Sequence, residues 1–150
     1  MNRDFAEMLA GLSEAGADFM VIGAHAVGVY ATPRATGDLD IWVRPTRANA
    51  ARVWAALVAF GAPLHELTQD DLTSDDVVYQ IGLAPNRIDI LTTIGGVSFE
   101  DAWPRRTSVA LWSLTVPVIG REDLITSKRA AGRPRDLADL ADLEGTGSTS

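Results

Sequence analysis

The chain has 150 residues, of which 47% are hydrophobic and 22% are charged, a balance typical of one globular domain with a buried core. Its formal net charge of −7 argues against a general nucleic-acid binder, which needs a basic surface to replace counterions. The absence of cysteine excludes disulfides, thiolate metal sites and cysteine nucleophiles.

The first half of the chain alternates patterns that predict helices and strands. Apolar residues at a spacing of three and four predict amphipathic helices, whereas short apolar or alternating runs predict strands. Gly16, Pro33 and Gly61 follow predicted helices as stop signals, and Thr46 is placed as an N-cap. The predicted elements are a helix over 4–15, a strand over 19–22, a helix over 24–30, a strand over 39–43 and a helix over 47–60.

The second half begins with a polar, acidic segment over 63–76 that we expect to be mostly loop. The predicted elements after it are strands over 77–83 and 87–91 that form a hairpin, a helical turn over 99–103, strands over 109–111 and 116–119, and helices over 121–131 and 135–143.

The order of these elements indicates an α/β (α+β) fold with a single mixed β-sheet flanked by helices. We expect one domain over 1–144, followed by a disordered tail of small residues over 145–150. The longest apolar stretches are of strand length, and the N-terminus lacks the pattern of a signal peptide. No membrane association and a cytoplasmic location are therefore expected.

Two aspartates lie close together in the predicted strand 39–43 and at its start. Because side chains alternate along a strand, Asp38 and Asp40 point to one face, and their backbones are separated by roughly 6.6 Å. Paired carboxylates repel each other unless a cation neutralises them, and hard oxygen ligands suit magnesium. Since the chain has fourteen aspartates, a solvated strand end is the alternative interpretation.

A third acid, Asp89, lies within the apolar strand 87–91. A lone carboxylate among apolar residues is unusual unless a partner satisfies it. If this strand pairs beside the strand that carries Asp40, three carboxylates converge, as a two-metal phosphoryl-transfer site requires. A salt bridge from Asp89 to a neighbouring arginine is the alternative.

The predicted strand 19–22 enters the next helix through a turn at Gly23 and Ala24. Free backbone N–H groups at such a helix N-terminus form a ready phosphate site. The turn matches neither a dinucleotide-binding glycine motif nor a P-loop.

Together, these motifs resemble the signature of the nucleotidyltransferase superfamily with the DNA polymerase β-like catalytic fold. The resemblance rests on Val21-Ile22-Gly23-Ala24, a spacer of thirteen residues, and Asp38-Leu39-Asp40-Ile41, with Asp89 in the place of the third carboxylate. The segments 33–43, 85–89 and 128–136 are similar to small bacterial nucleotidyltransferase-like proteins. Their relatives include abortive-infection toxins, which suggest a toxin–antitoxin role, and antibiotic nucleotidyltransferases.

The resemblance implies transfer of a nucleoside monophosphate from a nucleoside triphosphate such as ATP to an acceptor, with release of pyrophosphate. Asp38 and Asp40 would hold Mg²⁺ or Mn²⁺ with the triphosphate, and Asp89 would join them on a second ion and act as general base. The turn at Gly23 would bind the β- and γ-phosphates. The acceptor is an unidentified small molecule, protein or tRNA end.

Further cationic and polar residues are candidates for phosphate binding. Arg34 and Thr36 precede the acidic strand and are placed there as phosphate contacts, with ordinary turn chemistry as the alternative. Lys128, the sole lysine, is placed as a triphosphate or acceptor clamp because the family matches its position, with a solvated helix end as the alternative.

One departure from the signature is Ala24, where Gly or Ser is usual. Alanine lacks a hydroxyl donor and is less free at positive φ. This departure motivates an alternative function, namely a catalytically weak or inactive nucleotide-sensing or partner-binding module of the same fold. A homodimer or a protein partner would close the open side of so short a domain.

Five other residues carry expectations about their surroundings. We expect His25 on a helix surface and Trp42 either beside the nucleotide base or at the edge of the core. Asp136 and Asp139 are expected, with Asp142, on a solvated face of the last helix, where Asp136 pairs with an arginine of the preceding turn.

Overall fold

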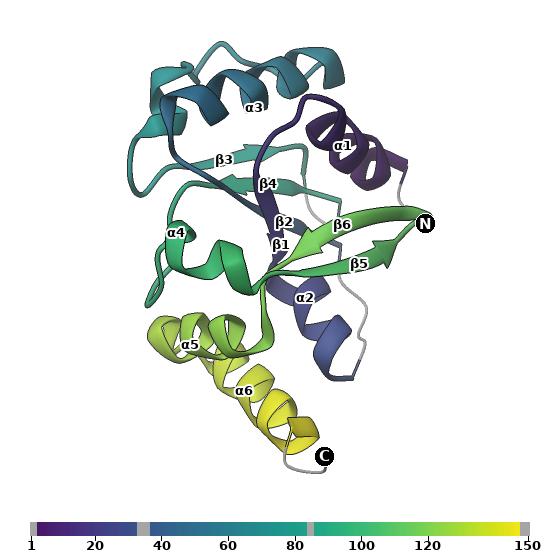
Figure 1. Cartoon of the computed structure of the whole chain (residues 1–150), viewed down its shortest axis with the longest axis vertical. Coiled ribbons are helices and arrows are strands. Elements are labelled where there is room, and N and C mark those ends of the chain that lie inside the picture. The colour runs from purple at the N-terminus through teal and green to yellow at the C-terminus, as the bar shows by residue number, and fades with distance from the viewer. Residues whose placement is uncertain (1–2, 33–36, 84–85, 148–150) are drawn as a thin grey trace.

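The computed structural model describes residues 3–32, 37–83 and 86–147 and has a six-stranded mixed sheet at its centre (Figure 1). The strand order is β3-β4-β2-β1-β6-β5. The strands are β1 (Phe19–Ile22), β2 (Leu39–Val43), β3 (Val78–Ile81), β4 (Ile88–Leu91), β5 (Thr107–Leu111) and β6 (Leu114–Val118). β2 pairs with β4 and β1 with β6 in parallel, whereas the other three neighbouring pairs are antiparallel.

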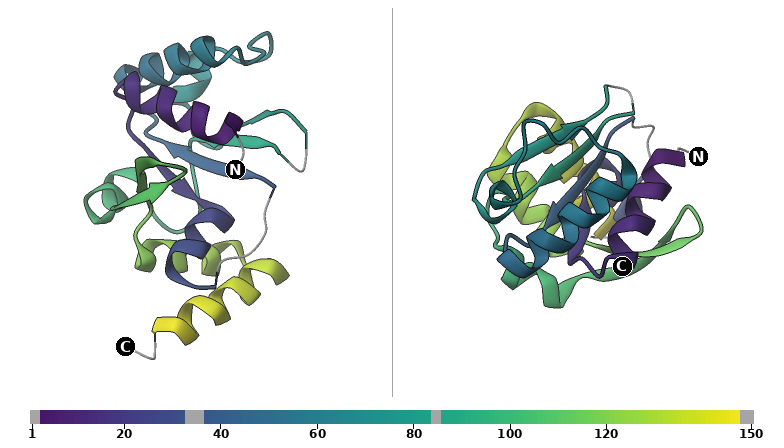
Figure 2. Two further views of the ribbon diagram at one scale, coloured as in Figure 1. Left: turned by 90° about the vertical axis from the view of Figure 1, so that its right-hand side faces the viewer. Right: turned by 90° about the horizontal axis from the view of Figure 1, so that it is seen from above.

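Helices lie on both sides of this sheet, with α1 and α3 together on one side and α2, α5 and α6 on the other (Figures 1 and 2). The α-helices are α1 (Arg3–Glu14), α2 (Gly23–Tyr30), α3 (Arg47–Phe60), α4 (Phe99–Ala102), α5 (Arg121–Ala131) and α6 (Pro134–Gly147). Short 3₁₀ turns lie at Asp70–Thr73 and Trp103–Arg105. No helix in the described ranges is long and apolar enough to cross a membrane.

The side chains of β2 alternate between the hydrophobic core and the acidic site. Leu39, Ile41 and Val43 are fully buried, and their side chains point to the opposite face from Asp40. The hydrophobic core therefore holds the strand from one side and leaves its acidic side chain free to face α2. This is the alternation predicted from the sequence.

The predicted elements are confirmed, with differences at their ends. The hairpin of β3 and β4 forms, but residues 84–85 in its turn lie outside the described residues. The last helix, α6, runs to Gly147, which is beyond the domain boundary placed at 144. It therefore takes up residues 145–147 of the tail that was expected to be disordered, because the backbone hydrogen bonds of a helix can continue through small residues. Residues 148–150 lie outside the described part.

A buried asparagine at the start of α3, Asn49, ties three segments together. Its side-chain oxygen accepts from the Asp18 N–H at 2.7 Å, and its amide group donates to the Asp18 and Arg44 carbonyls at 2.9 and 3.0 Å. The N-cap of the same helix is Thr46, whose side chain accepts from the Asn49 N–H, as predicted. Asn49 thus fixes the start of β1 and the end of β2 to one helix.

Replacement of this asparagine, Asn49→Ala, is expected to lower the free energy of unfolding by about 2–3 kcal/mol, because it leaves buried backbone groups without partners. Urea denaturation followed by circular dichroism measures the effect. Arg52→Ala on the exposed side of the same helix is the control and should change the free energy by less than about 0.5 kcal/mol. Equal effects of the two substitutions would contradict the role given to Asn49.

Candidate functional site

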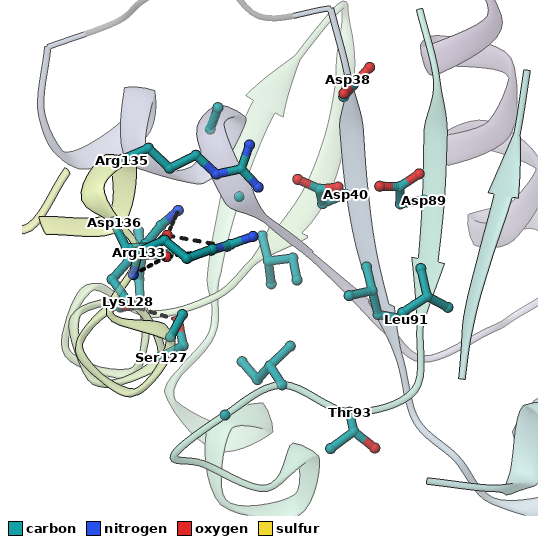
Figure 3. A pocket seen from close by; sticks show the side chains of 18 of the residues that line it. Asp38, Asp40, Asp89, Leu91, Thr93, Ser127, Lys128, Arg133, Arg135 and Asp136 are labelled. Atoms are coloured by element: carbon teal, nitrogen blue, oxygen red, sulfur yellow. Dashed lines mark hydrogen bonds and ion pairs between the residues drawn. The ribbon is translucent and has the colours of Figure 1, made fainter. Parts of the chain in front are cut away.

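The parallel pairing of β2 with β4 brings the acidic residues together. In this register Asp40 lies directly beside Asp89, and Leu39 lies beside Ile88. Asp38 immediately precedes β2 and shares the face of Asp40. The strand pairing on which the sequence prediction depended is therefore confirmed, and Figure 3 shows the carboxylates of Asp40 and Asp89 turned toward each other.

The proximity of these carboxylates has an electrostatic cost. The pKa of Asp40 is raised to about 6, first by burial and then by the charge of Asp89, a hydrogen bond with Asp89 and the charge of Asp38, against an opposing effect of Lys128. Asp89 itself is only 8% exposed. The site therefore carries more negative charge than its surroundings neutralise, which is the condition that favours binding of a cation.

Arg87, immediately before β4, pairs with two of the three acids. Its Nε lies 2.8 Å from Asp89 Oδ1, and its Nη2 lies 3.3 Å from Asp38 Oδ2. The salt bridge considered for Asp89 from the sequence is thus present. Within the described residues, no group of three His, Asp or Glu side chains is already gathered as a set of metal ligands.

Gly23 allows the first turn of α2 to approach the acidic strand. Its φ is +71°, in the left-handed region, and a Cβ at this position would overlap the Asp40 carboxylate. Ala24 is not among the residues with positive φ, so the backbone makes no demand for glycine there. The conformational objection to Ala24 is thereby removed, although its lack of a hydroxyl remains.

A cavity of about 630 Å³ contains the acids and the turn, and it has three chemically different walls (Figure 3). The acidic wall is formed by the three aspartates, and α5 with the start of α6 forms a basic wall opposite them. The third wall is largely uncharged. The basic wall includes Lys128, Arg133 and Arg135, and the uncharged wall includes Val78, Gln80, Leu91, Thr93 and Ile94. Of the residues predicted to contact phosphate, Gly23, Ala24 and Lys128 line the cavity, whereas Arg34 and Thr36 lie outside the described residues.

Lys128 is held by buried carboxylates rather than extended into solvent. Its Nζ lies 3.3 Å from Asp136 Oδ1 and 3.1 Å from Asp139 Oδ2, and the side chain is 11% exposed. The expected solvated face of the last helix is therefore wrong for Asp136 and Asp139, which are buried because they pack against α5 as the partners of Lys128. Asp136 also pairs with Arg133, as predicted, and these contacts hold the pKa of its carboxyl below the usual range despite burial.

Arg135 differs from its basic neighbours because it makes no ion pair with any described residue. Figure 3 shows its side chain extending over the cavity toward the acidic wall. Lys128 was predicted from the sequence as the clamp, but among the described residues of the basic wall it is Arg135 whose charge is not neutralised by an ion pair.

The packing of His25 and Trp42 can be compared with the positions predicted for them. His25 is half-buried rather than on the helix surface, because its ring lies between Phe5 and Trp112 at centroid distances of 5.8 and 5.1 Å. Trp42 belongs to the core, with 1% exposure and a hydrogen bond of 3.2 Å from its Nε1 to the Thr92 carbonyl. Neither ring lines the cavity.

Arg87 lines the cavity and contacts two of its acids, but it was not singled out from the sequence. The signal was present, because residues two apart on one strand share a face and Arg87 precedes Asp89 by two positions. Pairing of Leu39 with Ile88 also places Arg87 beside Asp38 across the two strands. Only the register, which the sequence did not show, connects the arginine with both acids.

No protein-family model matches the sequence, and no curated protein sequence matches it either. Solved structures that are similar to the chain include three with TM-scores above 0.6. The lincosamide antibiotic adenylyltransferase LnuA, solved with lincomycin bound, has 13% identity and a TM-score of 0.63, and the match covers 97% of this chain and 98% of that chain. A candidate nucleotidyltransferase from Thermotoga maritima has 11% identity and a TM-score of 0.63, with 95% and 91% covered.

The third structure, the antibiotic-resistance factor ANT(2'')-Ia, has 12% identity and a TM-score of 0.61, with 97% of this chain and 82% of that chain covered. At such identities the likeness concerns the fold. The chain has the nucleotidyltransferase fold, as the sequence resemblance predicted.

The raised pKa of Asp40 predicts a pH-dependent stability in metal-free buffer. Since its pKa is higher in the folded than in the unfolded state, the folded protein binds the proton more tightly and loses stability as pH rises from about 4 to about 6. Asp40→Asn, which is uncharged, should raise the free energy of unfolding by about 1–2 kcal/mol at pH 7.5 and leave it unchanged at pH 4. Urea denaturation with a chelator present measures both values.

The control for this substitution is Asp70→Asn, since Asp70 is exposed in a 3₁₀ turn outside the cavity. It should be close to neutral at both pH values. A loss of stability in Asp40→Asn at pH 7.5 would show that its charge is not destabilising.

Proposed function

We propose that this protein is a nucleotidyltransferase, which moves a nucleoside monophosphate from a nucleoside triphosphate to a hydroxyl-bearing acceptor by two-metal catalysis. The observation that carries the proposal is the parallel register that sets Asp40 beside Asp89, with Asp38 on the same face of the sheet. A second observation supports it, namely that the acids share one cavity with a cationic wall and a glycine turn. The fold agrees with this chemistry.

The carboxylates fit magnesium or manganese, since all three offer hard oxygen donors, and burial together with the charges of Asp89 and Asp38 disfavours the ionised form of Asp40 when no cation is bound. Asp38, Asp40 and Asp89 would hold the ions. Bound there, the metal would supply positive charge to the triphosphate and to the pyrophosphate that leaves.

In the transfer itself, the acceptor oxygen forms a bond to the α-phosphorus while the bond from that phosphorus to the oxygen bridging the β-phosphate breaks. The proton of the acceptor hydroxyl passes to the Asp89 carboxylate, which acts as general base. The electron pair of the broken bond leaves with pyrophosphate. Asp89 suits this role because it is buried in the cavity, next to the strand that carries the other two acids.

The triphosphate and the acceptor would contact different walls of the cavity. The triphosphate would lie between the turn at Gly23 and the basic wall, with Arg135 as the cation that contacts it. Lys128 would act indirectly, because its ammonium is occupied by Asp136 and Asp139 and fixes α6 to α5. The acceptor would lie along the uncharged wall formed by β3, β4 and the segment after β4.

Binding of nucleotide tests the proposal. Isothermal titration calorimetry with each triphosphate and Mg²⁺ should show binding that a chelator abolishes and that Asp40→Asn weakens at least about tenfold, because a metal ligand is lost. Asp89→Asn should reduce transfer to a panel of hydroxyl acceptors by about 10²–10⁴-fold. Asp70→Asn is again the control. Binding that is insensitive to both the chelator and Asp40→Asn would contradict the proposal, and binding without transfer would favour the nucleotide-sensing module.

The different roles proposed for Arg135 and Lys128 give a separate prediction. Arg135→Gln should raise the dissociation constant for nucleotide about tenfold and leave stability unchanged, because its charge is not needed by the fold. Lys128→Met should instead lower the free energy of unfolding by about 3–5 kcal/mol, since it removes a buried positive charge that pairs with two buried carboxylates. Calorimetry and urea denaturation of both variants measure the effects. Unchanged nucleotide affinity in Arg135→Gln would exclude Arg135 as the phosphate contact.

A further inference from the structure

Arg87 is bound to two of the three carboxylates that the proposed reaction assigns to metal ions. Its Nε and Nη2 donate to the two oxygens of Asp89 at 2.8 and 3.3 Å, and Nη2 also lies 3.3 Å from Asp38 Oδ2. Its backbone N–H donates to Asp38 Oδ1 at 3.3 Å. One arginine therefore bridges acids that belong to two different strands.

The register of the sheet makes this bridge a built feature of the site. Asp40 and Asp89 lie side by side on neighbouring strands. Two residues earlier in each segment, on the same face of the sheet, Asp38 and Arg87 lie side by side. The backbone between them is held by a hydrogen bond of 2.9 Å from the Leu39 N–H to the Arg87 carbonyl. The four side chains thus form a compact group of three negative charges and one positive charge.

The guanidinium and a metal ion need the same oxygens. The guanidinium donates to both Asp89 oxygens and so occupies one lone pair on each, and its positive charge repels a cation that approaches either oxygen. Arginine stays charged at any accessible pH, so the conflict is resolved by movement of the side chain and not by loss of a proton. With its side chain 31% exposed, Arg87 has room at the cavity edge for such movement.

We propose that Arg87 is a tethered counter-cation, which holds Asp38 and Asp89 in the metal-free protein and competes with the metal ion for their oxygens. This inference rests on the proposed function, because it concerns the same carboxylates. Arg87 is here a positioning residue: it keeps the acids together when no ion is bound and lowers the affinity of the site for metal. Because it lines the cavity, it stays beside the substrates after it is displaced.

Binding of Mn²⁺ alone, without nucleotide, tests the competition. Electron paramagnetic resonance of free Mn²⁺ should show that Arg87→Gln binds the ion at least about tenfold more tightly than the wild type, because a competing positive charge is removed. In the presence of a chelator the same variant should melt at a lower temperature than the wild type, since Asp38 and Asp89 lose their paired counter-charge. Saturating Mn²⁺ should then raise its melting temperature more than that of the wild type. Arg47→Gln, exposed at the start of α3, is the matched control.

The outcomes separate this inference from the function on which it rests. Equal or weaker Mn²⁺ affinity in Arg87→Gln, with binding intact in the wild type, overturns the inference alone. Absence of Mn²⁺ binding in both proteins overturns the proposed function and the inference together. If Arg87→Gln does not fold, Arg87→Lys decides the matter. A lysine cannot donate to two carboxylates in the paired geometry, so its Mn²⁺ affinity should exceed that of the wild type, and equality overturns the competition.

Discussion

The parallel register of β2 and β4 places Asp40 against Asp89 and so concentrates negative charge at one point of the sheet. Neighbouring strands are only about 4.8 Å apart, which is too close for two ionised carboxylates without a cation. The surrounding structure answers this repulsion in several ways. The raised pKa of Asp40 favours its protonated form, Arg87 supplies a counter-charge, and Gly23 leaves room for the Asp40 carboxylate to turn away from the strand.

The basic wall differs from the acidic wall because most of its positive charge is neutralised by aspartates of α6. Lys128 and Arg133 are matched by Asp136 and Asp139, so the four groups cancel each other and serve mainly to fasten α6 onto α5. Buried ion pairs of this kind seldom add much net stability, but removing one partner is costly. The network positions α6, the helix that carries Arg135 beside the cavity.

The sequence predicted the fold and the strands that carry the acidic residues well because both depend on local patterns. Alternation in 39–43 fixed which side chains face the core, and Gly61 and Thr46 marked the ends of α3. Long-range partners were harder to predict. The bridge made by Arg87 depends on which strand lies beside β2, and burial of Asp139 depends on how α6 packs on α5. Aspartates at every third position predict a solvated helix face. The sequence alone does not show that a lysine on another helix pairs with two of them.

The proposed reaction would require movement of side chains rather than of the sheet. Asp38, Asp40 and Asp89 are attached to paired strands whose spacing is set by backbone hydrogen bonds, so their Cα atoms have little freedom. Two ions in such sites lie about 3.5–4 Å apart, a separation that neighbouring strands about 4.8 Å apart can serve by side-chain rotation alone. The sheet therefore needs no rearrangement to accept metal. In the proposed competition with metal, the side chain that moves is Arg87, whose stem is anchored just before β4 and whose guanidinium contacts oxygens of Asp38 and Asp89.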